Sequence, residues 1–526
     1  MAKASGAEAT QRTGGLFIKK SVAQCQREAT SHSLKRTLGP VNLVLLGIGC
    51  IIGAGIYVMT GNAAANFAGP AVLLSFVIAG AACGFAGLCY AELASTMPVA
   101  GSAYTYSYAA MGELLAWTMG WLLVLEYGVA AATVAVGWSG YVKSFLTDVG
   151  LAVPISLASS TIQSAADATG QLVFSATGNV NLVAASGILL VTCLLVIGVS
   201  ESAAVNNVIV FIKVGVLVAF VLAGVGFIEP ANWTPFIPEN EGGFKYGVPG
   251  VFRAASVIFF AYVGFEAVST AASESRNPQR DMPIGILGSL FVCTVIYMIV
   301  AAVLTGIVPY NQLGVPEPIA VAVDRMGMPT FSFFIKIGAI AGLSSVMLIL
   351  TYGQSRVFFA MARDGLLPRM FAVIHPKFRT PWKGTILLGG LIAVAAALLP
   401  ITILGDLVSL GTAFAFAMVC ASVLWLRKAR PDLPRPFRAP GGVWIPILGI
   451  LSAGVLAAPL IIDVIAKAGN GDPIPAYIIG SYLVLGALIY IFYGYKNSRI
   501  AHGLEILDDS PLPGAMQAQA RGLDEK

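Results

Sequence analysis

The chain has 526 residues, of which 57% are hydrophobic and only 11% are charged. Soluble domains carry about twice that share of charged residues, and a soluble chain of this length usually divides into several domains with polar surfaces. The composition therefore excludes an ordinary soluble protein, and we expect no nucleic-acid partner. The net charge of +5 matters less than the places where the charges lie.

Apolar stretches long enough to cross a bilayer core of about 30 Å recur through most of the chain. In chain order, hydropathy predicts twelve spans, near 41–66, 70–97, 113–145, 181–199, 205–228, 249–272, 282–308, 330–362, 384–400, 403–426, 443–462 and 475–495. We therefore expect an all-α polytopic membrane protein with twelve transmembrane helices. The loop 146–180 is almost uncharged, and we expect it to be an external excursion.

Most of the 31 lysines and arginines fall in alternate loops, which is the distribution that orients membrane proteins. It predicts a cytoplasmic N-terminal segment, 1–38, and a cytoplasmic tail, 496–526. Residues 1–38 contain no apolar stretch, so the first span is expected to act as an uncleaved signal-anchor. We expect an integral protein of the cytoplasmic (plasma) membrane.

Two of the predicted spans are interrupted by glycine. The first contains Gly53-Ala54-Gly55 near its middle, and the sixth contains Gly264 at a similar depth. In each case the next span opens at a proline, Pro70 or Pro283, at almost the same spacing. Two breaks at corresponding positions indicate an internal repeat with the halves 39–228 and 249–426. The helices at 443–495 would lie outside the repeat. Such paired breaks also indicate a substrate-binding site near the middle of the membrane. The alternative is that these glycines only allow close helix packing.

Three segments carry a family resemblance: HSLKRTLGPVNLVLLGIGCIIGAGIY from His32, FFAYVGFEAVSTAASESRNPQRDMP from Phe259, and GQSRVFFAMARDGLLP from Gly353. Together they resemble the amino acid–polyamine–organocation superfamily. Within it, the chain is most similar to the cationic amino acid transporter family in its twelve-span bacterial form. The resemblance covers roughly residues 32–497. It implies a leucine-transporter-like fold of two inverted five-helix repeats with two additional helices.

An unwound turn in a membrane leaves backbone groups unpaired, which costs several kcal/mol per group unless a polar partner is present. A zwitterionic amino acid supplies partners of both kinds. We expect its carboxylate at the backbone of the first break and its ammonium at the carbonyls of the sixth helix. The resemblance implies the same contacts. The predicted residues are Ile52, Gly53, Ala54 and Gly55 for the first break and Phe260, Ala261 and Val263 for the second. Ala54 offers no hydroxyl where some relatives have one, so carboxylate binding would rest on the backbone alone.

Glu126 lies within the third apolar span with no basic residue near it in the sequence. An ionisable group at that depth is a functional candidate. We expect it in the pocket for the substrate side chain, where it would favour cationic substrates or, if protonated, accept neutral ones. The alternative is a protonated structural glutamate. The resemblance implies that Met347 lines the same pocket from helix 8, although ordinary packing would equally explain it.

Lys213 is the lone charge in the apolar run VIVFIKVGVLVAF of helix 5. The resemblance implies that a lysine here takes the place of sodium in proton-coupled relatives. Its ammonium would point at freed carbonyls of helix 1, and at Ser344 and Ser345 of helix 8. A desolvated lysine can gain and lose a proton during a transport cycle. The alternative is a static cation that holds the helices together.

The sequence therefore predicts a permease that imports L-amino acids with protons by alternating access, and that uses no cofactor. An amino-acid exchanger, a carrier restricted to cationic amino acids, and a sensor that binds without transporting remain alternatives. An intramembrane enzyme or a metal site is not expected, because the three histidines all lie in polar segments. The sequence does not identify which amino acids are carried.

Overall fold

The computed structural model describes residues 15–20, 38–98, 102–166, 172–198 and 203–502. Most of the predicted N-terminal segment 1–38, and the tail beyond residue 502, lie outside this part of the chain. The elements are α2 (Pro40–Ile51), η1 (Gly55–Met59), α3 (Thr60–Ala63), η2 (Ala64–Ala68), η3 (Gly69–Ala71), α4 (Val72–Thr96), α5 (Ser102–Ala110), α6 (Glu113–Leu123), η4 (Val124–Val129), α7 (Ala130–Asp148), η5 (Ile155–Leu157), β1 (Ile162–Ala166), β2 (Leu172–Ala176), α8 (Leu182–Ile197), α9 (Ala203–Gly224), η6 (Val225–Phe227), η7 (Pro230–Trp233), α10 (Gly247–Phe259), η8 (Phe260–Tyr262), α11 (Ala267–Thr270), η9 (Ala271–Glu274), α12 (Pro278–Ile307), η10 (Tyr310–Gln312), α13 (Pro318–Arg325), α14 (Pro329–Arg363), η11 (Arg369–Phe371), α15 (Trp382–Leu398), α16 (Ile401–Ala429), α17 (Trp444–Gly469), α18 (Ile474–Ile489), η12 (Tyr490–Gly494) and α19 (Tyr495–Asn497).

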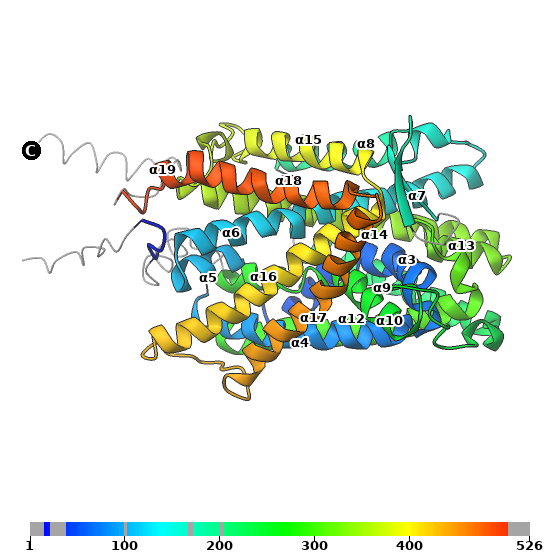
Figure 1. The fold of residues 1–526 in the computed structure, drawn as a ribbon, viewed down its shortest axis with the longest axis horizontal. Helices are drawn as coiled ribbons and strands as arrows, with labels where there is room; N and C mark the ends of the chain where they lie inside the picture. The colour runs from blue at the N-terminus through cyan, green and yellow to red at the C-terminus, as the bar shows by residue number, and fades with distance from the viewer. Residues whose placement is uncertain (1–14, 21–37, 99–101, 167–171, 199–202, 503–526) are drawn as a thin grey trace, which may run out of the picture.

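The long helices run roughly along one axis of the molecule (Figure 1). Within the described residues, nine helical segments are long and apolar enough to cross a membrane, and three shorter apolar helices accompany them. The shorter ones are α2, α8 and α15. The predicted class, a polytopic α-helical membrane protein, is confirmed. The count of twelve spans and the five-plus-five repeat stay predictions.

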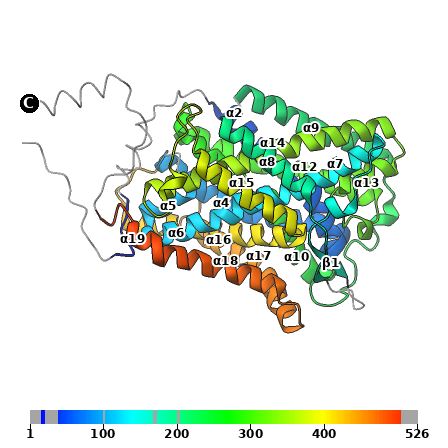
Figure 2. The same ribbon diagram turned by 90° about the horizontal axis from the view of Figure 1, so that it is seen from above.

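The interrupted helices lie deep in the bundle. The span that begins with α10 is 89% buried over its most apolar window, whereas the span of α18 is only 17% buried. Figure 2 shows α18 along one edge of the molecule. The helix α12 packs against both α2 and α4, α14 packs against α7, and α15 packs against α8. A break in a helix leaves backbone groups without their helical hydrogen bonds, and such groups are not tolerated next to lipid. Because the interrupted span is enclosed by protein, its break does not face the lipid.

A buried arginine fixes α10 to two neighbouring helices. The Nη2 atom of Arg253 lies 2.8 Å from Asp406 on α16 and 3.2 Å from Asp463 on α17. The arginine side chain is 1% exposed, so its charge depends on these two carboxylates. The sequence did not predict this pairing, because the two aspartates follow the arginine by 153 and 210 residues.

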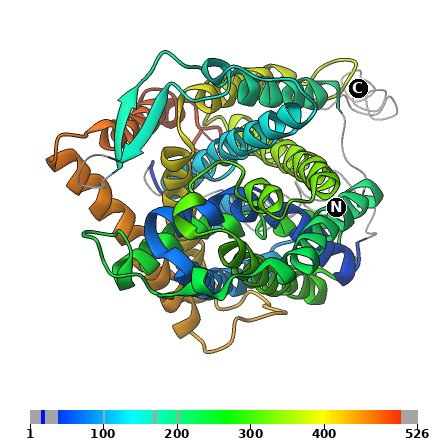
Figure 3. The same cartoon turned by 90° about the vertical axis from the view of Figure 1, so that its right-hand side faces the viewer.

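The loop 146–180 contains secondary structure that the sequence analysis did not predict. Strands β1 and β2 form an antiparallel hairpin in which Ile162 pairs with Ala176. The backbone N–H of Phe174 donates to the Oδ2 atom of Asp472 at 2.9 Å, so the hairpin is tied to the connection between α17 and α18. Seen along the long axis, it lies at the rim of the bundle (Figure 3).

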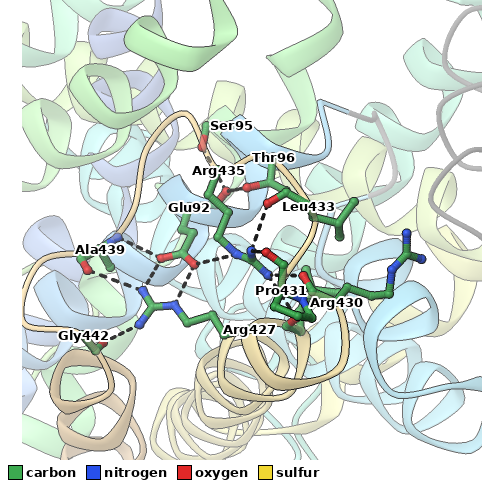
Figure 4. A network of polar contacts seen from close by, with 11 residues as sticks. Glu92, Ser95, Thr96, Arg427, Arg430, Pro431, Leu433, Arg435, Ala439 and Gly442 are labelled. Atoms are coloured by element: carbon green, nitrogen blue, oxygen red, sulfur yellow. Dashed lines mark hydrogen bonds and ion pairs between the residues drawn. The ribbon is translucent and has the colours of Figure 1, made fainter.

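Glu92 and two arginines join α4 to the end of α16 (Figure 4). The Nε atom of Arg427 donates to Glu92 at 2.9 Å and its Nη2 atom donates to the second carboxylate oxygen. Arg435 lies 3.7 Å from the same carboxylate, and the N–H of Ala439 donates to it at 2.8 Å. The carboxylate thereby also anchors the connection that leads to α17. Glu92 therefore has a structural role at this end of the bundle.

Candidate functional site

The first break follows directly from the glycines in its sequence. α2 ends at Ile51, and Ile52 is extended with φ −70° and ψ 101°. Ile52 and Gly53 form a bend, and Ala54, which is already helical, precedes the π-helical turn η1 that begins at Gly55. Among the described residues, the amides of Gly53 and Ala54 donate to no backbone carbonyl outside the helices. The break therefore presents N–H groups that can donate hydrogen bonds to an anionic group of a ligand.

The second break lies at the end of α10. A single 3₁₀ turn, η8, is followed by Val263 with ψ 131° and by Gly264 with φ 120°, a conformation that favours glycine. The carboxylate of Glu266 accepts the N–H of Gly264, at 2.9 and 3.1 Å from its two oxygens. This fully buried carboxylate stabilises the unwound turn.

The two breaks touch one another. A Cβ atom added to Gly55 would lie 2.2 Å from the Cα atom of Ala261, and one added to Gly264 would lie 2.8 Å from the backbone of Cys50. Real Cβ atoms do not approach other atoms so closely, so both glycines are required for the contact. Sequence analysis assigned the glycine at 55 to the approach of a substrate carboxylate, but in this structure the neighbour is the backbone of the second break.

Tyr297 on α12 bridges the breaks from the side, and the sequence analysis missed it. Its hydroxyl lies 2.7 Å from the carbonyl oxygen of Ile51 and 3.2 Å from that of Ala261, and can donate to either. The side chain is fully buried. A lone tyrosine within an otherwise apolar span was the only signal in the sequence, because its partners are far away along the chain.

We expect Tyr297→Phe to destabilise the protein by about 1–3 kcal/mol, since two buried carbonyls lose their partner. Amino acid uptake should fall as well, because both carbonyls belong to the breaks. Thermal unfolding and uptake of the purified variant would be compared with Tyr477→Phe, whose side chain is 72% exposed and should change neither. Unchanged stability and uptake in Tyr297→Phe would show that the hydroxyl does not hold the breaks.

A small cavity lies between the breaks. It has room for about one water molecule. An amino acid can enter only if the surrounding helices part. Its lining consists of Cys50, Ile51, Gly53, Ala54, Gly55, Val134, Phe260, Val263, Val346 and Leu350.

Five of the predicted substrate-binding residues line this cavity, namely Gly53, Ala54, Gly55, Phe260 and Val263. Four do not. Ile52 and Ala261 are fully buried within the breaks. Met347 lies on the neighbouring face of α14, where its methyl group would be 3.7 Å from a Cβ added to Gly187 on α8. Val346 and Leu350 take its place in the lining.

Glu126, the fourth, lies in the π-helical turn η4 and is fully buried. Its carboxyl group lies within hydrogen-bond range of the carboxyl group of Glu266 in the second break. Two buried carboxyl groups at this range can share a proton, since two negative charges so close together are unfavourable. Glu126 therefore contacts the second break through Glu266, although it does not line the cavity.

Lys213 reaches the first interrupted helix as predicted. Its Nζ atom donates to the carbonyl oxygen of Gly49 at 2.8 Å, and its side chain is 1% exposed. Its stem packs at Gly342 of α14, where an added Cβ would lie 3.1 Å away. The hydroxyls of Ser344 and Ser345 donate to carbonyls of their own helix. The lysine thus joins α9 to α2 and α14. This geometry is compatible with a proton carrier and with a static cation that holds the helices together.

The other features of the described chain do not form a second site of this kind. A hollow between α4 and α10 is lined only by apolar side chains: Leu74, Val77, Ile78, Ile237, Val248, Val251 and Phe252. Such a lining suits a lipid chain and offers nothing to an amino acid. No group of three or more metal-binding side chains occurs in the part of the chain that the structure describes.

The comparisons with known proteins agree with this geometry. The amino acid permease family matches residues 38–485. The chain is 42% identical to a methylthioribose transporter of Bacillus subtilis (strain 168), over 92% of this chain and 99% of that protein. It is also 42% identical to a branched-chain amino acid permease of the same organism, over 93% and 99%. A vacuolar cationic amino acid transporter of Arabidopsis thaliana is 38% identical over 76% of this chain and 65% of its own length. The chain therefore belongs to the amino acid permease family of the amino acid–polyamine–organocation superfamily, whose members are transporters and not enzymes.

Proposed function

We propose that this protein is a secondary active transporter that imports L-amino acids together with protons by alternating access. The observation that carries the proposal is the pair of helix breaks around a small cavity. One break offers the N–H groups of Gly53 and Ala54, and the other offers carbonyl groups near Val263. Only a ligand with an anionic and a cationic group on neighbouring atoms uses both.

In this proposal the substrate carboxylate binds the amides of the first break, and its ammonium binds the carbonyls of Phe260, Ala261 and Val263. The half-helix that starts at Gly55 directs the positive end of its dipole toward the carboxylate. The tight cavity corresponds to a closed conformation, and opening to either side of the membrane requires α2 and α10 to move against their neighbours.

The proposal places twelve spans, arranged as two inverted repeats and two additional helices, in the cytoplasmic membrane with both termini inside. The distribution of lysine and arginine supports this orientation. Lys213, held against the carbonyl of Gly49, is the proposed proton carrier.

The choice of amino acids as substrate rests on the backbone chemistry of the breaks and on the names of most relatives. Two relatives of equal identity carry different names, methylthioribose transporter and branched-chain amino acid permease, so identity alone does not select a substrate. A sugar thioether has no ammonium group to use the carbonyls of the second break, which favours the amino acid.

Uptake by the purified protein in proteoliposomes tests the proposal. We expect labelled amino acids to accumulate when the outside is more acidic, and unlabelled L-amino acids to compete better than D-amino acids or methylthioribose. Accumulation that needs an internal amino acid instead of a pH gradient would indicate an exchanger. Binding without any uptake would indicate a sensor.

A further inference from the structure

Lys213 contacts both halves of the first interrupted helix. Its ammonium donates to the carbonyl oxygen of Gly49 on α2, before the break, at 2.8 Å. Its own backbone carbonyl accepts a hydrogen bond from the hydroxyl of Tyr57 on η1, after the break, at 3.3 Å. Both side chains are buried. One residue of α9 therefore spans the break, with its side chain on the first half and its backbone on the second.

The half that follows the break is fixed to α7. The hydroxyl of Tyr141 donates to the backbone carbonyl of Tyr57 at 2.7 Å, and the two rings meet edge to face with their centroids 6.2 Å apart. A Cβ atom added to Gly137 on the same helix would lie 2.4 Å from a methyl group of Val58. Real Cβ atoms do not approach other atoms so closely, so η1 and α7 are in direct contact.

The half that precedes the break packs against a different helix, α12. A Cβ atom added to Gly47 would lie 2.4 Å from the hydroxyl oxygen of Ser289, and one added to Gly285 would lie 2.7 Å from the side chain of Leu43. The helix is interrupted between its two halves and their neighbours differ, so the two halves can move separately about the break. Any such movement must change one of the two contacts of Lys213.

The helix that carries the lysine contacts both α2 and α14. Its contact with α14 is close, because a Cβ added to Gly338 would lie 2.2 Å from Val216, and one added to Gly342 would lie 3.1 Å from the stem of Lys213. The helix α14 packs against α7 in turn. The hydrogen bond from Tyr57 completes this packed unit of α9, α14, α7 and η1 at the residue that bears the ammonium.

We propose that Tyr57 is a positioning residue for proton coupling. Its hydroxyl holds the backbone of Lys213 to the half of the helix that follows the break, so the ammonium loses the carbonyl of Gly49 when α2 moves. Without the hydroxyl, this part of α9 can follow α2 and keep the contact through part of the movement. The two conformations then differ less in how well they stabilise the charged lysine, and coupling weakens. This inference rests on the proposed function, because it assumes that Lys213 carries the proton.

Tyr57→Phe tests the inference, because it removes the hydroxyl and keeps the packing of the ring. Two kinds of transport are compared in proteoliposomes made from one preparation. Accumulation of labelled amino acid driven by a pH gradient depends on proton coupling, whereas exchange of labelled for unlabelled amino acid at equal pH needs no net movement of protons. We expect Tyr57→Phe to reduce accumulation at least threefold and to leave exchange within about twofold of the wild type. A purely structural defect would lower both equally.

Tyr246→Phe is the matched control. The hydroxyl of Tyr246 donates to the carbonyl oxygen of Ala65 at 2.7 Å, and its side chain is buried. This bond also holds the half of the helix that follows the break, but it does not involve α9. Accumulation and exchange should therefore keep the same ratio in this variant as in the wild type.

The pH dependence of substrate affinity provides a second measurement, which requires no transport. In detergent, the amino acid concentration that stabilises the wild type against heat should change with pH, and Tyr57→Phe should reduce that change at least twofold. The inference alone is overturned if the wild type accumulates amino acids and Tyr57→Phe matches it, or loses accumulation and exchange equally. A wild type that exchanges amino acids but does not accumulate them would overturn the proposed proton coupling and this inference with it.

Discussion

Gly55→Ala should reduce amino acid uptake at least tenfold, and it should lower the thermal stability of the protein. The added Cβ atom would lie 2.2 Å from the Cα atom of Ala261 and 2.3 Å from its Cβ atom. Its closest neighbour is backbone, so no side-chain rotation relieves the overlap, and one break must move away from the other. Overpacking of this kind typically costs about 1–3 kcal/mol.

Gly53→Ala is the matched control within the same break. Its Cβ atom would lie 3.1 Å from the two methyl groups of Val346, which can give way by a small rotation. We expect a milder loss of uptake and little loss of stability. Equal behaviour of the two variants, measured by uptake in proteoliposomes and by thermal unfolding, would mean that the contact between the breaks is not required for function.

The positions of the breaks could be predicted because their signals are local. Glycines inside an apolar span, and a proline opening the next one, act on the backbone of the residues that carry them. The structure has both breaks where the sequence indicated, with Gly264 at φ 120°. The contact from Lys213 to the first interrupted helix was also foreseeable, because a lone ammonium in an apolar helix must reach a carbonyl.

The partners that decide the rest of the site lie far away in the sequence. Tyr297 reaches carbonyls of Ile51 and Ala261, at separations of 246 and 36 residues. Arg253 finds two aspartates on helices that follow it by 153 and 210 residues. The local sequence of a helix does not indicate which of its faces packs against which neighbouring helix. For the same reason, the sequence could not predict that Met347 points away from the cavity.

Lys213 and Lys336 are both buried in the bundle, but their positive charges have different partners. Lys336 pairs with Asp148 at 2.7 Å and with Asp324 at 3.0 Å, so its positive charge is balanced by carboxylates. Lys213 donates to a neutral carbonyl, that of Gly49 on α2. Movement of this carbonyl therefore changes how well the charged form of the lysine is stabilised.

Lys213→Ala should retain amino acid binding within about threefold and lose uptake driven by an inward proton gradient. In the structure, the carbonyl of Gly49 on α2 stabilises the ammonium at 2.8 Å. If inward opening swings α2 away, the ammonium loses this partner and releases its proton to the cytoplasm. Each conformation then prefers a different protonation state, which is what coupling requires. The backbone contacts proposed for the substrate do not involve the amine.

Lys336→Ala is the matched control, because it also removes a buried lysine but should not affect the coupling of uptake to protons. It leaves two carboxylates without a cation, so we expect lower thermal stability but uptake that still responds to the pH gradient. Both variants would be measured in sodium-free proteoliposomes, with binding and uptake determined on the same preparation. If uptake by Lys213→Ala keeps the pH dependence of the wild type, the proton is carried elsewhere. The buried carboxyls of Glu126 and Glu266, which lie beside the same breaks, would then be the groups to test.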